Sequence, residues 1–237
     1  MKLKLRLNRF RLWAALLILL AVVAALVMLL RGGRQETVGP DSGTLTLVID
    51  PGHGGIDSGA VGADGTRESD LNLAIGLKLR ALAELCAQDN VLIRQDDSSK
   101  CDTEAYSEHR DLECRTEMVN AVGNPVYISI HQNDYPTAQP SGSQVIYARG
   151  EGSEALGGIT HANLLQNLCP NSRRVAEPAT KKLYILSHLN CPAILVECGF
   201  MSNTIDLENL KRPDYQTDIA LILMGSFLQY KQNTIRI

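Results

Sequence analysis

The chain has 237 residues, of which 45% are hydrophobic and 21% are charged. This composition is ordinary for a globular protein, and it excludes wholesale disorder and a fibrous repeat. The length suits one sizeable domain besides a short N-terminal segment. The first 34 residues hold seven of the 23 Lys and Arg and no acid, which leaves 16 basic against 26 acidic residues, a formal net charge of −10, in the remainder. Such an acidic balance argues against nucleic acid as a partner.

The N-terminal segment has the features of a membrane anchor. Residues 12–30 form an uncharged apolar run of 19 residues. A helix of this length extends for about 28 Å, close to the thickness of the hydrocarbon core of a bilayer. The basic residues that precede the run are Lys2, Lys4, Arg6, Arg9 and Arg11. By the positive-inside rule, they keep the N-terminus in the cytoplasm and place everything after Arg34 across the membrane.

We therefore expect residues 1–34 to form a cytoplasmic basic tip and a transmembrane anchor, which makes the chain a single-pass protein of the cell membrane. A cleaved signal peptide is the alternative, but the run exceeds a typical h-region and residues 31–34 show no small-x-small cleavage pattern. Residues 35–44 are polar with Gly, Pro and Ser, which predicts a linker. The main domain then covers residues 45–232 and lies on the extracytoplasmic side.

Short apolar runs alternate with helical patterns along this domain. The candidate strands are residues 45–49, 91–93, 126–130, 144–148, 183–186 and 193–196. The candidate helices are residues 70–88, 107–122, 153–168 and about 214–230. This alternation predicts a single layered α/β domain with a central, mainly parallel sheet flanked by helices, preceded by the one transmembrane helix. In such sheets, ligands bind beyond the carboxyl ends of the strands.

Three of the candidate strands lead to side chains that bind metals or transfer protons. His53 follows the first strand, His131 follows the third, and Glu197 follows the last. One histidine after a strand is usually a hydrogen-bonded loop residue, but three such residues at one sheet edge indicate a site. A catalytic zinc takes about three protein ligands, commonly imidazoles with one carboxylate, and keeps a position for water. We expect His53 and His131 to be ligands of a Zn²⁺ ion.

Glu68 is the candidate for the third ligand. It stands before Ser69 and Asp70, which have the character of N-cap residues for a helix that begins at Leu71. Five glycines between His53 and Glu68 permit the backbone turns that a return to the metal needs. An acid in the first turn also stabilises the helix dipole. From the residues alone, the ligand role and the structural role of Glu68 stay equally open.

Glu197 ends a buried apolar run, where an unpaired carboxylate costs several kcal/mol. It therefore needs a partner or a function. Beside a metal-bound water it would act first as a general base and then as the acid that protonates the leaving amine. Burial would raise its pKa and a metal charge would lower it, so the sequence does not predict the direction of the shift.

The motifs around these residues resemble those of a known family. DPGHGG (50–55), SIHQND (129–134) and ILVECGFMSN (194–203) resemble the three motifs of the zinc-dependent N-acetylmuramoyl-L-alanine amidases. The three motifs are long and stand in the family's order. The resemblance extends over residues 45–230, which is the whole main domain.

The resemblance implies a zinc ion bound by His53, Glu68 and His131, with Glu197 as the catalytic residue, on an α/β fold with a mainly parallel sheet. It implies hydrolysis of the amide that joins the lactyl group of N-acetylmuramic acid to L-alanine in peptidoglycan. The short anchored build, without wall-binding repeats, also looks like the CwlD type of spore-forming bacteria, which acts on spore-cortex peptidoglycan. That type would place the chain in sporulation and germination.

Two departures from the family pattern concern substrate contacts. Residues 132–134 read Gln-Asn-Asp where many members have Ala-Asn-Ala, and residues 187–190 stand where an arginine is often seen. Neither touches an expected zinc ligand, but both leave open a weakly active enzyme or one that needs an accessory protein. Two further alternatives are a zinc peptidase acting on wall peptides and a membrane-tethered module that only binds peptidoglycan.

The remaining polar and sulfur side chains have structural interpretations. Asp50 is expected to hold the His53 loop through backbone N–H groups or to support a histidine. An exported domain with six cysteines could form three disulfides. Cys86 and Cys198 occupy apolar patterns, however, so we expect mostly thiols. Cys101 and Cys114, on either side of a polar loop, are the natural candidate pair.

Overall fold

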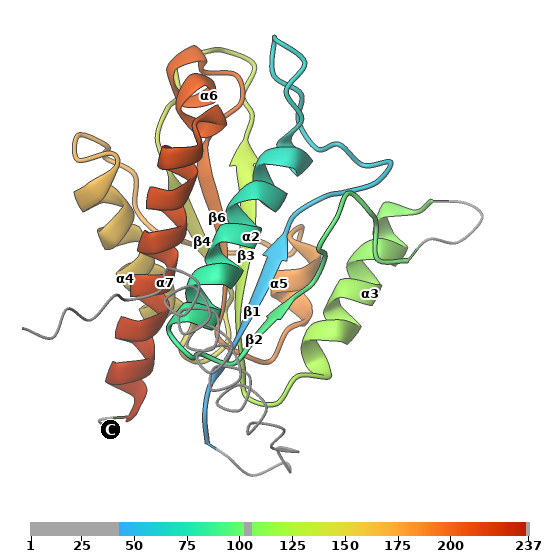
Figure 1. Cartoon of the computed structure of the whole chain (residues 1–237), viewed down its shortest axis with the longest axis vertical. Helices are drawn as coiled ribbons and strands as arrows, with labels where there is room; N and C mark the ends of the chain where they lie inside the picture. Colours follow the sequence, from blue (N-terminus) through green and yellow to red (C-terminus); the bar gives the residue numbers. More distant parts are fainter. Residues whose placement is uncertain (1–42, 102–105, 236–237) are drawn as a thin grey trace, which may run out of the picture. The chain divides into compact units, whose positions relative to one another are not determined.

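The computed structural model describes residues 43–101 and 106–235 (Figure 1). Gly43–Ile237 forms one compact unit. Within the described part of the chain, no helix is both long and apolar enough to cross a bilayer. The anchor predicted at residues 1–34 and most of the linker at residues 35–44 lie outside the described residues, so both stay predictions.

Six strands form one mixed sheet with the order β2-β1-β3-β6-β4-β5. They are β1 (Thr46–Pro51), β2 (Asn90–Leu92), β3 (Pro125–Asn133), β4 (Gln144–Tyr147), β5 (Glu177–Pro178) and β6 (Ala193–Phe200). Neighbouring strands are parallel except β4 and β6, which are antiparallel. The connection between β3 and β4, residues 134–143, is shorter than the dozen or so residues of a parallel crossover, so β4 runs back. The predicted α/β domain with a mainly parallel sheet is confirmed, since four of the five neighbouring strand pairs are parallel.

Helices cover both faces of the sheet. They are α2 (Glu68–Leu85), α3 (Glu108–Asn120), α4 (Ser153–Asn167), α5 (Tyr184–His188), α6 (Thr204–Lys211) and α7 (Pro213–Ile235). α2, α4 and α7 pack together over one face, and α3 and α5 cover the other (Figure 1). The two faces carry separate hydrophobic cores.

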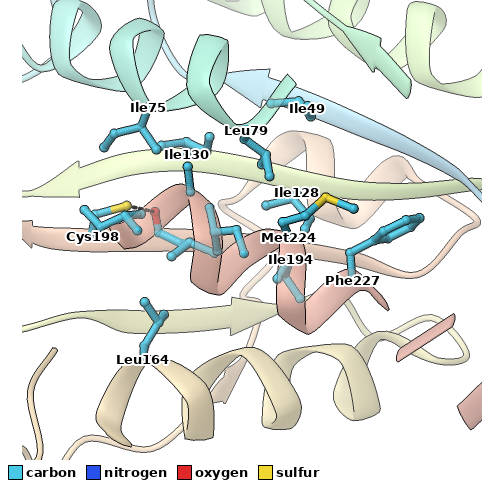
Figure 2. Close-up of a cluster of buried hydrophobic side chains, with 14 of the residues drawn as sticks. Ile49, Ile75, Leu79, Ile128, Ile130, Leu164, Ile194, Cys198, Met224 and Phe227 are labelled. Carbon is cyan, nitrogen blue, oxygen red and sulfur yellow. Dashed lines mark hydrogen bonds between the residues drawn. The ribbon is translucent and has the colours of Figure 1, made fainter. Parts of the chain in front are cut away.

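Strand side chains alternate between these two cores, because successive residues of a strand point to opposite faces. Ile49 of β1 belongs to the core under α2 and α7, whereas Val48 belongs to the core under α3 and α5. Figure 2 shows the larger core, in which Ile128 from β3 lies among side chains of the covering helices such as Ile75 from α2 and Phe227 from α7. All five of these side chains are fully buried. The central strands are thus covered by buried apolar side chains on both faces.

Most predicted elements occur close to their predicted positions, but the run at residues 183–186 was wrongly assigned to a strand. Its residues Tyr184–Leu186 lie in helix α5. Leu183 and Leu186, three residues apart, pack into the same core, which is helical spacing. Short apolar runs do not distinguish a strand from a helical turn. The sequence interpretation also missed α6, whose N-cap Asn203 accepts hydrogen bonds from the N–H groups of Ile205 and Asp206.

Candidate metal centre

The carboxyl ends of β1, β3 and β6 bring the predicted site residues to one edge of the sheet. In the parallel register, Pro51 of β1 lies beside Ile130 of β3, and His131 lies beside Glu197 of β6. His53 follows two residues after the end of β1. The prediction that these strand ends meet is therefore confirmed by the topology of the sheet.

Glycines let the loop after β1 return to the helix α2. A Cβ added at Gly52 would lie 2.2 Å from the imidazole of His131, and one at Gly59 would lie 2.5 Å from Oε2 of Glu68. Gly59 also has a φ of 61°, a conformation that L side chains rarely adopt. His53 itself has a φ of 62°, a backbone conformation that is uncommon outside glycine. The loop is thus shaped around the three side chains of the cluster.

The start of α2 differs from the expected one. The helix begins at Glu68 after Arg67, and no side chain caps it. The N–H of Glu68 instead donates to the carbonyl of Ala60, and the N–H of Ser69 donates to the carbonyl of Ser58. The returning loop therefore satisfies the first N–H groups of the helix, and it fixes Glu68 in the first turn beside the loop.

His53, Glu68 and His131 form one cluster with potential metal-ligand atoms. Oε1 of Glu68 lies 3.2 Å from Nε2 of His53 and 3.0 Å from Nδ1 of His131. The ligand atoms of the three residues all lie within 4.8 Å of one another. The two imidazoles are 26% and 21% exposed, whereas Glu68 is 4% exposed. A cation held here would have a buried carboxylate on one side and access to solvent on the other.

Neighbouring groups orient His53 and Glu68 in the cluster. Oδ2 of Asp57 accepts from Nδ1 of His53 at 2.7 Å, which leaves Nε2 directed at Glu68. Oε2 of Glu68 accepts from the N–H of Ala60 at 2.9 Å, and Oε1 accepts from the N–H of Gln132 at 3.0 Å. A carboxylate behind a ligating histidine fixes its tautomer and orientation. Asp57, which the sequence interpretation did not single out, has this position.

The pKa values in the cluster reflect these contacts. Burial opposes the charge of Glu68, but hydrogen bonds from His131 and His53 outweigh it and hold the pKa of Glu68 well below its usual range. Burial likewise opposes the charge of His53, yet Asp57 and Glu68 raise its pKa to about 10. The hydrogen bond from His53 lowers the pKa of Asp57 to about 2. The cluster holds a positive charge between two carboxylates, a setting that suits a divalent cation.

Glu197 lies beside the cluster without being part of it. Its Oε2 is buried and has no hydrogen-bond partner among the described residues. Burial raises the pKa of Glu197 to about 7, against the lowering effect of His131 and with a further rise from Glu68. A carboxyl group that titrates near neutral pH is suited to take up a proton and return it. Glu68 and Glu197 therefore differ in the protonation states that their surroundings favour.

Two buried arginines hold the His53 loop by hydrogen bonds to its backbone carbonyls. The sequence interpretation did not find them. Arg94 donates to the carbonyls of Pro51, Gly52 and Ser69. Arg115 donates to the carbonyl of His53 at 2.6 Å. The two guanidiniums together hold the backbone that leads out of β1.

Asp50 has a different partner from the one expected. It accepts from the guanidinium of Arg115 and from the hydroxyl of Tyr127, and all three side chains are at most 2% exposed. Asp50 therefore acts on the His53 loop through Arg115 rather than through backbone N–H groups. A buried acid in a strand requires a compensating cation. Asp50, at the end of an apolar run, could therefore have predicted that a basic side chain is buried beside it.

Among the described cysteines, one pair is bonded. Cys101 and Cys114 form a disulfide with a Cα–Cα distance of 6.1 Å. Cys86, Cys169, Cys191 and Cys198 are free thiols. The expectation of mostly thiols with this one candidate pair is confirmed.

Comparison with known proteins identifies the family. The family model described as N-acetylmuramoyl-L-alanine amidase matches residues 47–224. The germination-specific N-acetylmuramoyl-L-alanine amidase of Bacillus subtilis is 30% identical over 196 residues, 81% of each chain. The structure of the CwlD amidase of Clostridioides difficile, in complex with the GerS lipoprotein, has a TM-score of 0.74 and 33% identity over 79% of this chain and 98% of that one. AmiC2 of Nostoc punctiforme has a TM-score of 0.67 and 33% identity over 81% and 99%. This chain belongs to the N-acetylmuramoyl-L-alanine amidase family.

Proposed function

We propose that the chain is a zinc-dependent N-acetylmuramoyl-L-alanine amidase that hydrolyses the bond between the lactyl group and L-alanine in peptidoglycan. The observation that carries the proposal is the cluster of His53, Glu68 and His131 with Glu197 beside it, in a chain of this family. Two imidazoles and one carboxylate suit Zn²⁺, whereas Ca²⁺ and Mg²⁺ prefer oxygen ligands throughout. The donor set of the cluster therefore fits zinc.

A zinc ion bound by His53, Glu68 and His131 would supply an activated water and polarise the lactyl carbonyl. Glu197 takes a proton from the attacking water, whose oxygen bonds to the lactyl carbonyl carbon. Glu197 then gives the proton to the alanine nitrogen as the C–N bond breaks. The products are a lactyl carboxylate on the glycan and a stem peptide with a free L-alanine amine. Asp57 keeps the ring of His53 oriented throughout.

Product analysis tests this function. The chain is incubated with vegetative and with cortex-type peptidoglycan, and the products are identified by liquid chromatography and mass spectrometry. We expect intact stem peptides with a free L-alanine amine, and the germination-specific relative makes the cortex-type polymer the expected better substrate. Cleavage inside the stem peptide would instead identify a peptidase, and retention on the polymer without new ends would identify a binding module.

We further propose that residues 12–30 anchor the chain in the cell membrane with the amidase domain outside the cytoplasm, because this run is apolar, long and preceded by basic residues. The CwlD amidase of Clostridioides difficile was solved with a lipoprotein partner. An extracytoplasmic accessory protein of that kind is the partner to seek by co-purification. Membrane fractionation with protease accessibility of the domain in spheroplasts tests the anchor and its orientation.

A further inference from the structure

A pocket opens beside the metal cluster on the face of the sheet that α3 and α5 cover. It has a volume of about 180 Å³ and is lined by His53 and His131 at the cluster. Leu112 of α3, Leu186 of α5 and Leu195 of β6 contribute apolar walls. Substrate bound at the cluster therefore has one substituent of its amide next to this pocket.

The size of the pocket favours the peptide side of the scissile amide. Sites that enclose drug-sized ligands have about 300–1,000 Å³, and this pocket is smaller. A glycan strand is a row of bulky sugar rings and needs an open groove. The stem peptide is slender, and where its residue after L-alanine is a glutamate linked through the γ-carboxyl, that residue has a free α-carboxylate.

Most charges that line the pocket are already neutralised within the protein. Asp50 and Asp111 form ion pairs with Arg115. Asp57 is paired with His53. Asp50 and Asp111 share one guanidinium, and the nearby charge of Arg94, which also interacts with Asp50, balances the second carboxylate.

Lys182 is the exception among the cations of the lining. It lies in the exposed segment between β5 and α5, and no described residue forms an ion pair or a hydrogen bond with its ammonium. Glu108 of α3 also lines the pocket, and no described basic side chain forms an ion pair with it. Without Lys182 the pocket would therefore present an uncompensated negative charge to the substrate.

We propose that Lys182 forms a carboxylate subsite that binds the α-carboxylate of the stem-peptide residue after L-alanine. This inference rests on the proposed amidase function. The ammonium makes a charge-assisted contact with the carboxylate, which draws the peptide into the apolar pocket and leaves the scissile amide at the cluster. Lys182 acts through binding and takes no part in the proton transfers.

Two matched substrates and three variants test the subsite. The substrates are glycan strands whose stem glutamate carries either the α-carboxylate or an α-carboxamide. The variants are Lys182→Ala, Lys182→Arg and the control Lys181→Ala, which removes the neighbouring exposed lysine that does not line the pocket. Initial rates of L-alanine amine release are measured over a range of substrate concentrations to separate KM from kcat.

For Lys182→Ala we expect kcat/KM on the carboxylate substrate to fall about tenfold, mainly through KM, since one charge-assisted contact is lost. On the carboxamide substrate the change should stay below about twofold. Lys182→Arg should retain most of the activity, and Lys181→Ala should match the wild type. An equal loss on both substrates, an unchanged KM, or the same loss in Lys181→Ala would overturn the subsite. A wild-type chain that releases no amine from either substrate would instead overturn the amidase function itself.

Discussion

Two carboxylates, Glu68 and Glu197, lie near the same histidines but have opposite environments. Glu68 accepts hydrogen bonds from two backbone N–H groups and lies against both imidazoles, so its charged form is stabilised. Glu197 has an oxygen that no described donor reaches, so its neutral form is favoured. Pairs of acids whose pKa values are driven apart by their surroundings commonly divide the anionic and the proton-transferring roles of a site. We assign the metal to Glu68 and the proton transfers to Glu197.

This assignment predicts that Glu197→Gln keeps its zinc and loses its activity. The amide is nearly isosteric with the carboxyl group, so the fold should persist, but it does not accept a proton from water. General acid–base assistance is worth about 10²- to 10⁴-fold, so turnover should fall by at least about 10²-fold with little change in melting temperature. Elemental analysis and amine release measure the two quantities on the same sample.

The matched variant is Glu68→Gln, which we expect to hold well under one zinc per chain. If Glu197→Gln loses the metal while Glu68→Gln keeps it, the two roles are reversed. If Glu197→Gln turns over at the wild-type rate, Glu197 carries no proton in the reaction.

The raised pKa of His53 predicts that zinc binding depends on pH. With a pKa of about 10, the imidazole of the metal-free site carries a proton at neutral pH, and zinc must displace that proton. Zinc affinity should therefore rise with pH, by about tenfold per unit between about pH 6 and pH 8. Calorimetry in buffers of different ionisation enthalpy counts the protons released. An affinity that stays constant over this range would show that His53 is neutral before zinc binds.

At the scale of elements, the sequence predicts the strand ends well and the connections poorly. His53, His131 and Glu197 follow runs that are apolar enough to be buried strands, so their meeting at one edge follows from parallel topology. The role of Glu68 remained ambiguous because its position depends on the conformation of the glycine-rich loop. The glycines permit a return to the metal site, but they do not determine it. Arg115 was missed because its partner Asp50 is 65 residues away, and no local pattern records such a pairing.

The disulfide connects the segment that ends at Cys101 with helix α3, and both contact the His53 loop. Cys101 follows a segment whose Asp97 accepts from the N–H of Gly55 at 2.9 Å. Cys114 lies in α3 next to Arg115, which donates to the carbonyl of His53. The bond therefore links the two supports of the loop that carries His53.

We predict that Cys101→Ser with Cys114→Ser lowers the free energy of unfolding by up to about 3 kcal/mol, the value for a closed loop of this size. The zinc affinity should fall as well, because the supports of the His53 loop become less restrained. Thermal unfolding and a zinc competition titration measure the two effects. Cys86→Ser, which changes an exposed free thiol, is the control and should match the wild type. Equal stability of the double variant and the wild type would show that the bond has no structural effect.

At the scale of the whole molecule, the N-terminal segment differs in composition from the rest of the chain. The apolar run and the seven basic residues stand in the first 34 positions, and the remainder is strongly acidic. The family match at residues 47–224 falls within the compact unit Gly43–Ile237. The residues described for both cores, the sheet and the metal cluster all belong to this unit.

We therefore predict that the chain lacking residues 1–34 folds as a soluble protein with about one zinc bound and full amidase activity on fragmented peptidoglycan. The shortened chain keeps all the residues described for the two cores, the sheet and the cluster, so we expect its melting temperature to equal that of the full chain in detergent. In cells, the full chain should sediment with membranes and the shortened one should not, because the uncharged apolar run is absent. Size-exclusion chromatography, circular dichroism and fractionation measure these properties. An insoluble shortened chain beside a folded full chain would show that the N-terminal segment is part of the folded unit, and membrane association of both would assign the attachment to the amidase domain.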